Sequence, residues 1–314
     1  MNLLVNRNCN LACPYCFAAK IFKEDSGITF EEYKKHIDFL NRLNEEEVRL
    51  IGGEPLLHPN IKRFVNYATV KGIKRVLIFT NGLLLDKMYN IANIEKVDYL
   101  VNINSPENIG QENYNKIINN LKNYPVKNRC MIGINIYKEN QDIKFFLNAI
   151  KETKPPKIRV GIASLNYKKA SKIDMFEYYK SLKPVLLELI EYCLKTKTEI
   201  SIDCNGIPPC CFNDEEKEML KQKNVWDLID NRCSAVFDIL PNGDFIRCFP
   251  VSEVITLKDY TQYQTFKDMK NALYEPFKKI NDKRYNRKEC ENCEYKRLGK
   301  CKGGCLSFYM DEYC

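Results

Sequence analysis

Three cysteines near the amino terminus constrain this chain more than any other feature. Cys9, Cys13 and Cys16 lie in one short run, CNLACPYCF, directly after the first apolar segment. The C-x3-C-x2-C spacing offers three thiolates from a single loop, one fewer than a 4Fe–4S cluster needs. The spacing therefore favours a cluster with one open iron, where an outside ligand can bind. A zinc loop and three ordinary buried cysteines are the alternatives.

The composition favours an iron–sulfur protein of the cytoplasm. The chain has 314 residues and 15 cysteines, and it begins without a signal-peptide pattern. No apolar run approaches the roughly 20 residues that a membrane span needs. Cytosolic thiols stay reduced, so many cysteines there indicate metal ligation rather than disulfides. The net charge of +8 comes from 49 basic residues interleaved with 41 acidic ones, which does not favour a nucleic-acid partner.

The first two-thirds of the chain alternates between strand-like and helix-like segments. A capping box, Thr29-Phe-Glu-Glu32, predicts a helix that runs to Leu43. Strands are predicted at six apolar runs: 3–5, 48–51, 75–79, 99–103, 131–136 and 158–162. Repeated strand–helix units imply an α/β fold with a parallel sheet and outer helices. We expect two domains, residues 1–198 and residues 199–314.

The cysteine loop and a second motif together resemble the radical S-adenosylmethionine (SAM) superfamily. That motif, Gly52-Gly53-Glu54-Pro55, follows the second predicted strand. The resemblance implies a partial (β/α)6 barrel of the TIM type, with its site at the carboxyl ends of the strands. It also implies that Cys9, Cys13 and Cys16 hold a 4Fe–4S cluster whose open iron binds SAM. An electron from the cluster then splits SAM, and the resulting 5′-deoxyadenosyl radical abstracts hydrogen.

The resemblance also suggests which residues hold SAM. Gly52, Gly53 and Glu54 would hold its amino group. Two later segments, Thr80-Asn81-Gly82 and Asn104-Ser105-Pro106, occupy positions that meet the SAM carboxylate or ribose in the family. Asn-Gly and Ser-Pro are also ordinary turn signals, so the plain turn interpretation of these two stays open. Tyr15 is expected to form a wall of the adenine site.

The carboxyl-terminal third holds ten of the cysteines in a regular spacing. Cys233-x9-Gly243-x4-Cys248 encloses Pro-Asn-Gly, a strong hairpin signal. Farther on come Cys290-x2-Cys293-x7-Cys301-x3-Cys305 and, at the end, Cys314. A zinc ribbon is the rival interpretation of the later pairs. Cys130, in a predicted strand, and Cys193, on the apolar face of a predicted helix, are expected in the core.

This spacing resembles the SPASM extension of radical SAM enzymes, which carries one or two auxiliary 4Fe–4S clusters. By that resemblance, Cys233, Cys248 and Cys305 hold auxiliary cluster I. Auxiliary cluster II would then be held by Cys290, Cys293, Cys301 and Cys314. Seven residues separate Cys293 from Cys301 where the family usually has five.

The fourth ligand of cluster I is open at this point. Pro208 and Pro209 fix an extended approach and can present a neighbouring thiol, so Cys210 is favoured. Cys211 and Cys204 are alternatives, as is an iron left open for substrate.

The expected function is that of a radical SAM oxidoreductase acting on a ribosomally made peptide, forming thioether or carbon–carbon cross-links. Phe249 follows Cys248 where the sulfatase-maturing members have a carboxylate, which argues against formylglycine formation. The first strand begins at Met1, so a separate leader-peptide-binding protein is expected, or a small substrate. A dehydrogenase or epimerase of sugar- or alcohol-like molecules is the alternative, and a non-catalytic metal-binding module is a remote one. The expected electron donor is a flavodoxin or ferredoxin.

Overall fold

The computed structural model describes residues 1–16, 27–203, 206–229, 233 and 237–311. Two cysteines of the sequence predictions, Cys204 and Cys314, lie outside these ranges. No helix within them is both long and apolar enough to span a membrane.

The described residues contain one nine-stranded sheet, in the order β7-β6-β5-β4-β3-β2-β1-β8-β9. Every neighbouring pair is parallel except β8 and β9, which form an antiparallel hairpin. The strands are β1 (Asn2–Asn6), β2 (Glu47–Gly52), β3 (Arg75–Thr80), β4 (Val97–Asn102), β5 (Cys130–Ile136), β6 (Lys157–Ile162), β7 (Glu199–Asp203), β8 (Asp238–Ile239) and β9 (Phe245–Ile246). The parallel α/β barrel predicted from the sequence is confirmed.

In addition to the six strands predicted at apolar runs, the sheet contains β7 and the two strands of the β8–β9 hairpin. β7 pairs with β6 at the edge of the sheet, and only its two isoleucines, Ile200 and Ile202, are buried. An edge strand with two buried side chains shows no continuous apolar run, so the pattern did not single it out.

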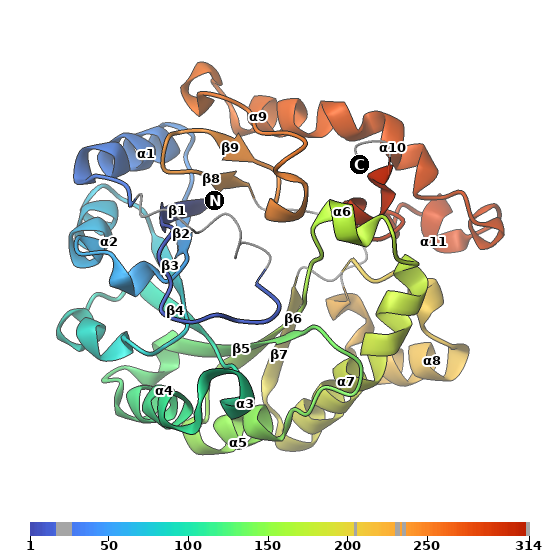
Figure 1. The fold of residues 1–314 in the computed structure, drawn as a ribbon, viewed down its shortest axis with the longest axis horizontal. Coiled ribbons are helices and arrows are strands. Elements are labelled where there is room, and N and C mark those ends of the chain that lie inside the picture. The colour runs from blue at the N-terminus through green and yellow to red at the C-terminus, as the bar shows by residue number, and fades with distance from the viewer. Residues whose placement is uncertain (17–26, 204–205, 230–232, 234–236, 312–314) are drawn as a thin grey trace.

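Helices cover the outer side of the curved sheet (Figure 1). In the first two-thirds they are α1 (Phe30–Arg42), α2 (Ile61–Val70), α3 (Pro106–Ile109), α4 (Gln111–Asn123), α5 (Lys144–Thr153), α6 (Tyr167–Ala170) and α7 (Met175–Thr196). Four more follow: α8 (Asp214–Gln222), α9 (Phe266–Tyr274), α10 (Lys278–Lys283) and α11 (Glu294–Arg297). The predicted capping box is present, because the side chains of Thr29 and Glu32 each accept from the other's backbone N–H. Helix α1 begins at Phe30, directly after Thr29.

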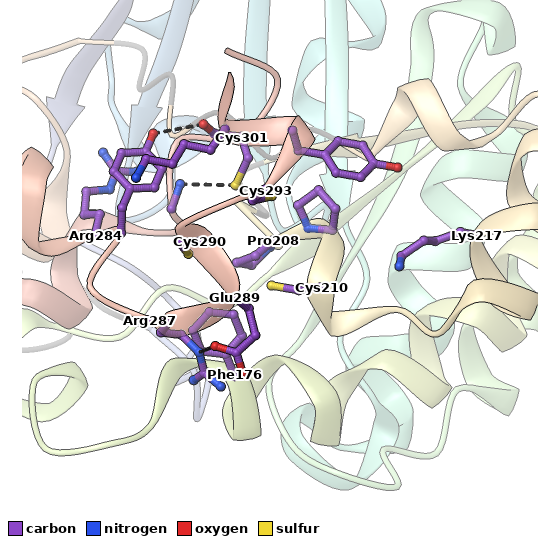
Figure 2. A pocket seen from close by; sticks show the side chains of 15 residues that line it. Phe176, Pro208, Cys210, Lys217, Arg284, Arg287, Glu289, Cys290, Cys293 and Cys301 are labelled. Carbon is purple, nitrogen blue, oxygen red and sulfur yellow. Dashed lines mark hydrogen bonds and ion pairs between the residues drawn. The ribbon is translucent and has the colours of Figure 1, made fainter. Parts of the chain in front are cut away.

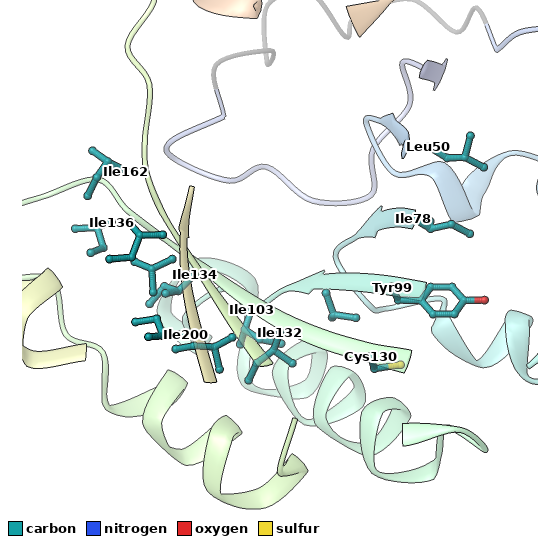
Figure 3. Packing of buried hydrophobic residues seen from close by; sticks show 14 of the residues in the cluster. Leu50, Ile78, Tyr99, Ile103, Cys130, Ile132, Ile134, Ile136, Ile162 and Ile200 are labelled. Atoms are coloured by element: carbon teal, nitrogen blue, oxygen red, sulfur yellow. The ribbon is translucent and has the colours of Figure 1, made fainter. Parts of the chain in front are cut away.

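The core lies between the sheet and these helices. Side chains of the central strands, such as Leu50, Ile78 and Ile132, pack together there (Figure 3). Cys130 and Cys193 are both buried in this layer, which confirms their predicted core positions. Burial raises the pKa of the Cys130 thiol to about 12, so it stays protonated at neutral pH.

The carboxyl-terminal third joins the other end of the sheet through β8. The turn of the β8–β9 hairpin contains Gly243 at a φ of 82°, a conformation that glycine adopts without strain. Asn2 on β1 donates its side-chain Nδ2 to Oδ1 of the buried Asp238 at 2.6 Å. The first strand is therefore joined directly to the carboxyl-terminal third at β8.

The loop after β1 lies against the glycines that end β2. The Gly53 N–H donates to the Asn6 carbonyl at 3.2 Å, and the Glu54 N–H donates to the Asn8 carbonyl at 2.7 Å. A Cβ on Gly53 would lie only 2.1 Å from the Asn8 oxygen, and one on Gly52 would lie 2.7 Å from the Asn6 oxygen. Backbone thus packs on backbone here, and no side chain fits between.

Replacing Gly53 with Ala is expected to displace the loop that carries the three cysteines. The new methyl group collides with a backbone carbonyl that has no room to retreat, at a cost of about 1–3 kcal/mol. Gly72→Ala is the matched control, because that glycine has a φ of +101° with open space around its Cα. Gly53→Ala should lose iron as well as thermal stability, whereas Gly72→Ala should lose only stability. Equal iron contents in the two variants would contradict this account.

The pH dependence of the free energy of unfolding should show the titration of the Asp238 carboxyl. Burial raises the pKa of its carboxyl to about 7, against the smaller lowering effect of the Asn2 hydrogen bond. The folded state then holds a proton that the unfolded state has released, so stability falls as pH rises towards 7 and levels off above it. Asp238→Asn keeps the hydrogen-bond acceptor and removes the titration. The stability advantage of the variant over the parent should grow by about 1–2 kcal/mol between pH 6 and pH 8, measured by unfolding.

Candidate functional site

The cysteine loop follows β1 and crosses the interior of the barrel at the carboxyl edge of the sheet (Figure 1). The Cys16 N–H donates to the Cys13 carbonyl at 3.0 Å, which closes a tight turn between the two thiols. Burial, followed by the charges of Cys9 and Cys16, raises the pKa of the Cys13 thiol to about 11. The three side chains therefore lie within electrostatic range of one another. Because iron ligation requires thiolates, binding of a metal here must displace their protons.

The loop after β2 is tied to the end of β3 by Glu54, whose side chain is only 1% exposed. Its Oε1 accepts from Leu56 N at 3.0 Å and Thr80 Oγ1 at 2.7 Å, and its Oε2 accepts from Asn81 N at 2.7 Å. Burial raises the pKa of this carboxyl to about 7, while these hydrogen bonds oppose the rise. The carboxylate thus points into the protein, where the sequence had suggested a position beside a ligand ammonium.

Two further contacts fix the cysteine loop to β3 and β4. The Asn81 side-chain Nδ2 donates to Asn10 Oδ1 at 2.7 Å, and the Tyr15 hydroxyl donates to Asn104 Oδ1 at 2.7 Å. Asn81 also hydrogen-bonds to the Cys9 thiol, which partly opposes the rise in its pKa caused by burial. The residues that the sequence proposed after these strands therefore hold the loop in place.

A cavity of about 320 Å³ opens beside this loop, at the carboxyl ends of β4 and β5. Tyr15 and Ser105, both proposed from the sequence, line it. The ring of Tyr137 lies 5.1 Å from that of Tyr15, between ring centroids. Five amide side chains also line it, beside the charged residues Glu107, Lys138 and Asp142; the amides are Asn104, Asn108, Asn135, Gln141 and Asn148. Such a lining can hydrogen-bond hydroxyl groups and heterocyclic nitrogens.

The sequence did not lead us to expect Asn135, Tyr137 or Arg159 near the site. Arg159 on β6 donates its Nη1 to Asn135 Oδ1 at 2.7 Å and its Nε to Asp203 Oδ2 at 3.1 Å. These contacts form a polar row across β5, β6 and β7 near the cavity. The signal was present: Asn135 interrupts the apolar run Met131–Ile136, at the strand end where sites of parallel barrels lie.

Three of the carboxyl-terminal cysteines gather around a buried arginine. Arg247 is 2% exposed, and its Nη2 donates to the Cys233 carbonyl at 2.9 Å and to the Cys233 sulfur at 3.4 Å. Its Nη1 reaches the Cys248 sulfur at 3.8 Å. A hydrogen bond from Cys305, opposed by burial and helped by the charge of Arg247, lowers the pKa of Cys233. These are the three thiols that the resemblance assigns to auxiliary cluster I.

A second group of cysteines lines another cavity, of about 150 Å³. It contains Cys290, Cys293 and Cys301, and it also contains Cys210 (Figure 2). The sequence had placed Cys210 with Cys233 and Cys248, neither of which lines this cavity. The short turn Pro209–Cys211 carries it to the later group instead.

The donors in all three places are thiols, the ligand type of iron–sulfur clusters. In the described part of the chain, no three Cys, His, Asp or Glu side chains are placed to share a single metal ion. A zinc ion binds thiolates at about 2.3 Å and draws their sulfurs close together, whereas a cluster spreads them around a larger core. The donor type in each place is therefore the one that iron–sulfur clusters use.

Comparisons with known proteins agree with this geometry. Residues 3–148 match the family model described as "Radical SAM superfamily". A GTP 3′,8-cyclase of Chlorobaculum tepidum is 38% identical over 88 residues, which are 28% of this chain and 27% of that protein. The chain therefore aligns with only about a quarter of that curated relative.

Two solved structures share the fold over nearly the whole chain. Streptococcus suis SuiB bound to the precursor peptide SuiA has a TM-score of 0.68 at 16% identity, covering 98% of this chain and 71% of SuiB. The native anSMEcpe with bound AdoMet and Cp18Cys peptide also has a TM-score of 0.68, at 18% identity, covering 99% of this chain and 94% of that one. The family model covers the part of the chain that contains the three-thiol loop, and the two structures show that the chain shares their fold.

Proposed function

We propose that this chain is a radical SAM oxidoreductase that modifies a ribosomally made peptide. The observation that carries the proposal is the three-thiol loop, fixed to the ends of β2, β3 and β4 beside an amide-lined cavity. We assign residues 1–198 to SAM cleavage and residues 199–314 to a SPASM-type part with two auxiliary clusters. The two parts share one sheet, because β7 pairs with β6 and β8 pairs with β1.

In this proposal Cys9, Cys13 and Cys16 hold the 4Fe–4S cluster. When bound, that cluster supplies the electron that splits SAM into methionine and a 5′-deoxyadenosyl radical, which takes a hydrogen atom from the substrate. The residues of the chain position the reactants. Glu54 and Asn81 hold the cysteine loop in place, the backbone of Gly52 and Gly53 would bind the SAM amino group, and Thr80 and Ser105 would border the remainder of the ligand.

A peptide substrate is favoured by how far each likeness extends. SuiB and anSMEcpe match almost the entire chain, including the cysteine-rich third, and both of these structures contain a bound peptide. The cyclase match covers 28% of the chain. Cross-link or thioether formation is the proposed outcome, with auxiliary clusters that assist electron transfer or substrate binding. A flavodoxin or ferredoxin as electron donor, a separate leader-binding protein and a cytoplasmic location complete the proposal.

A small substrate is the second candidate. The cavity of about 320 Å³ falls in the range of small-molecule sites, and its amides suit a sugar or nucleotide. The similarity to a GTP 3′,8-cyclase supports the same alternative. A dehydrogenase or epimerase acting on a sugar- or alcohol-like molecule belongs to this class.

Replacing Cys13 with Ala tests the central claim. The anaerobically reconstituted parent, with dithionite and SAM, should release 5′-deoxyadenosine, and Cys13→Ala should release none above background. The variant should also lose about four of roughly twelve iron atoms per chain. Cys193→Ala is the control, because that thiol is buried in the core. A parent that never cleaves SAM would refute the proposed function.

The same assay separates the two substrate classes. Synthetic peptides encoded by genes next to this one should increase 5′-deoxyadenosine release and lose two hydrogen atoms per cross-link, detected by mass spectrometry. GTP and nucleotide sugars should have no effect. Stimulation by a nucleotide and not by any peptide would replace the first candidate with the second.

Tyr15→Phe should weaken SAM binding and leave the chemistry intact. The change removes the 2.7 Å hydrogen bond to Asn104 and keeps the aromatic ring, so about three- to tenfold in affinity is expected. Iron content should not change. Tyr67→Phe is the matched control, since it loses a hydroxyl bonded to Asp38 at the surface. If the Tyr15 variant binds SAM normally and forms no product, the residue carries the radical rather than lining the adenine site.

A further inference from the structure

We propose that Cys210 is the fourth ligand of the cluster held by Cys290, Cys293 and Cys301, which makes that site a complete four-thiolate site. This inference rests on the proposed function, because it takes the cavity to hold a 4Fe–4S cluster. A cubane of that type needs four cysteine ligands. The chain supplies them from two segments that lie about 80 residues apart in the sequence.

The four sulfur atoms point into one space. Figure 2 shows Cys210 reaching in from one side of the cavity, with Cys290, Cys293 and Cys301 on the opposite loop. The cavity of about 150 Å³ is partly open to solvent, and all four of these cysteines line it.

The turn that carries Cys210 is held in place by contacts that do not involve the thiols. A Cβ on Gly304 would lie 2.3 Å from the Met175 sulfur and 3.4 Å from Pro208 Cγ, so Pro208 lies directly against the Gly304 backbone. Gly206, at a φ of +48°, packs in the same way on the backbone of Cys305. The position of Cys210 near Cys301 is therefore fixed by close backbone packing.

A lysine holds the other side of the same turn. Lys183 on α7 donates its Nζ to the Cys211 carbonyl at 3.2 Å and forms an ion pair with Glu216 at 2.7 Å. Both partners of the pair are largely shielded from water, which strengthens their attraction. The peptide that follows Cys211 is thus held in place, and of the two adjacent cysteines only Cys210 lines the cavity.

The lining suits an anionic group. A cubane with four thiolates carries about −2, and the cavity wall includes the guanidinium groups of Arg284 and Arg287. The Cζ atom of Arg287 lies 3.7 Å from the centroid of the Phe176 ring, and this cation–π contact fixes the guanidinium group. The Gly303 N–H donates to the Cys301 sulfur at 3.3 Å, a contact of the kind that tunes iron–sulfur clusters.

Cys210 and Cys211 are neighbours in opposite surroundings. Cys210 is solvent-exposed and lines the cavity, whereas Cys211 is only 2% exposed and is absent from the lining. A cluster that uses Cys210 is complete without Cys314. Of the described cysteines, the site around Arg247 then has three: Cys233, Cys248 and Cys305.

Thiol protection in the loaded protein tests the assignment without any mutation. The reconstituted full-length chain is treated anaerobically with iodoacetamide before and after removal of its iron, and each modified cysteine is located by mass spectrometry. Cys210 should be protected together with Cys290, Cys293 and Cys301, and all four should react once the iron is gone. Reaction of Cys210 at the same rate in both states would overturn the proposal.

Iron content in variants gives an independent answer. Cys210→Ala should lower the iron by about four atoms, while Cys211→Ala and Cys314→Ala should keep it. Cys210→Ala combined with Cys233→Ala should lose about eight atoms, because the two residues serve different clusters. A loss of only four in the double variant would place both in one cluster, and one zinc per chain in this site would exclude a cluster there.

SAM cleavage separates this proposal from the proposed function. Cys210→Ala should still release 5′-deoxyadenosine with dithionite, because the cluster at Cys9, Cys13 and Cys16 is untouched. Release by a Cys210→Ala protein that keeps all its iron would refute the ligand assignment and leave the enzyme assignment standing. Absence of release by the parent chain would refute the enzyme assignment, whatever Cys210 binds.

Discussion

The chemistry of this molecule depends on a contact between two stretches of backbone. Where β2 ends, Gly53 lies so close to the Asn8 carbonyl that even one carbon atom would not fit between them. The adjoining hydrogen bonds, from Gly53 to Asn6 and from Glu54 to Asn8, turn this closeness into a fixed register. The loop that follows β1 thereby takes its position from the sheet itself, before any metal binds.

The parallel sheet also provides further attachment points for the cysteine loop. Because neighbouring parallel strands end at the same edge, the loops after β2, β3 and β4 all reach the cysteine loop, each by a different polar group. The backbone of Glu54, the side chain of Asn81 and the side chain of Asn104 make these attachments. A site supported from three successive loops loses little precision when one contact is removed, which suits a reaction whose radical must meet a single hydrogen atom.

The sequence predicted those features that depend on neighbours along the chain. Six strands, the capping box at Thr29 and the hairpin around Gly243 follow from periodicity and turn chemistry, and all are present. The direction of the Glu54 carboxylate could not be predicted, because it depends on donors 26 and 27 residues away. Which cysteines lie near Cys210 depends on Pro208 packing against Gly304. This contact joins residues almost 100 positions apart, so the spacing of cysteines in the sequence cannot reveal it.

Arg247 places a permanent positive charge beside two cysteines of the carboxyl-terminal third. Its guanidinium cannot lose a proton, it lies against the ring of Tyr274 at 4.6 Å, and it is almost fully withdrawn from water. Thiolates at Cys233 and Cys248 can balance that charge, but thiols cannot. Because an unpaired cation in an apolar interior is strongly unfavourable, Arg247 favours the thiolate form of Cys233, which is the form that can ligate a metal. The fold itself thus prepares this sulfur for binding.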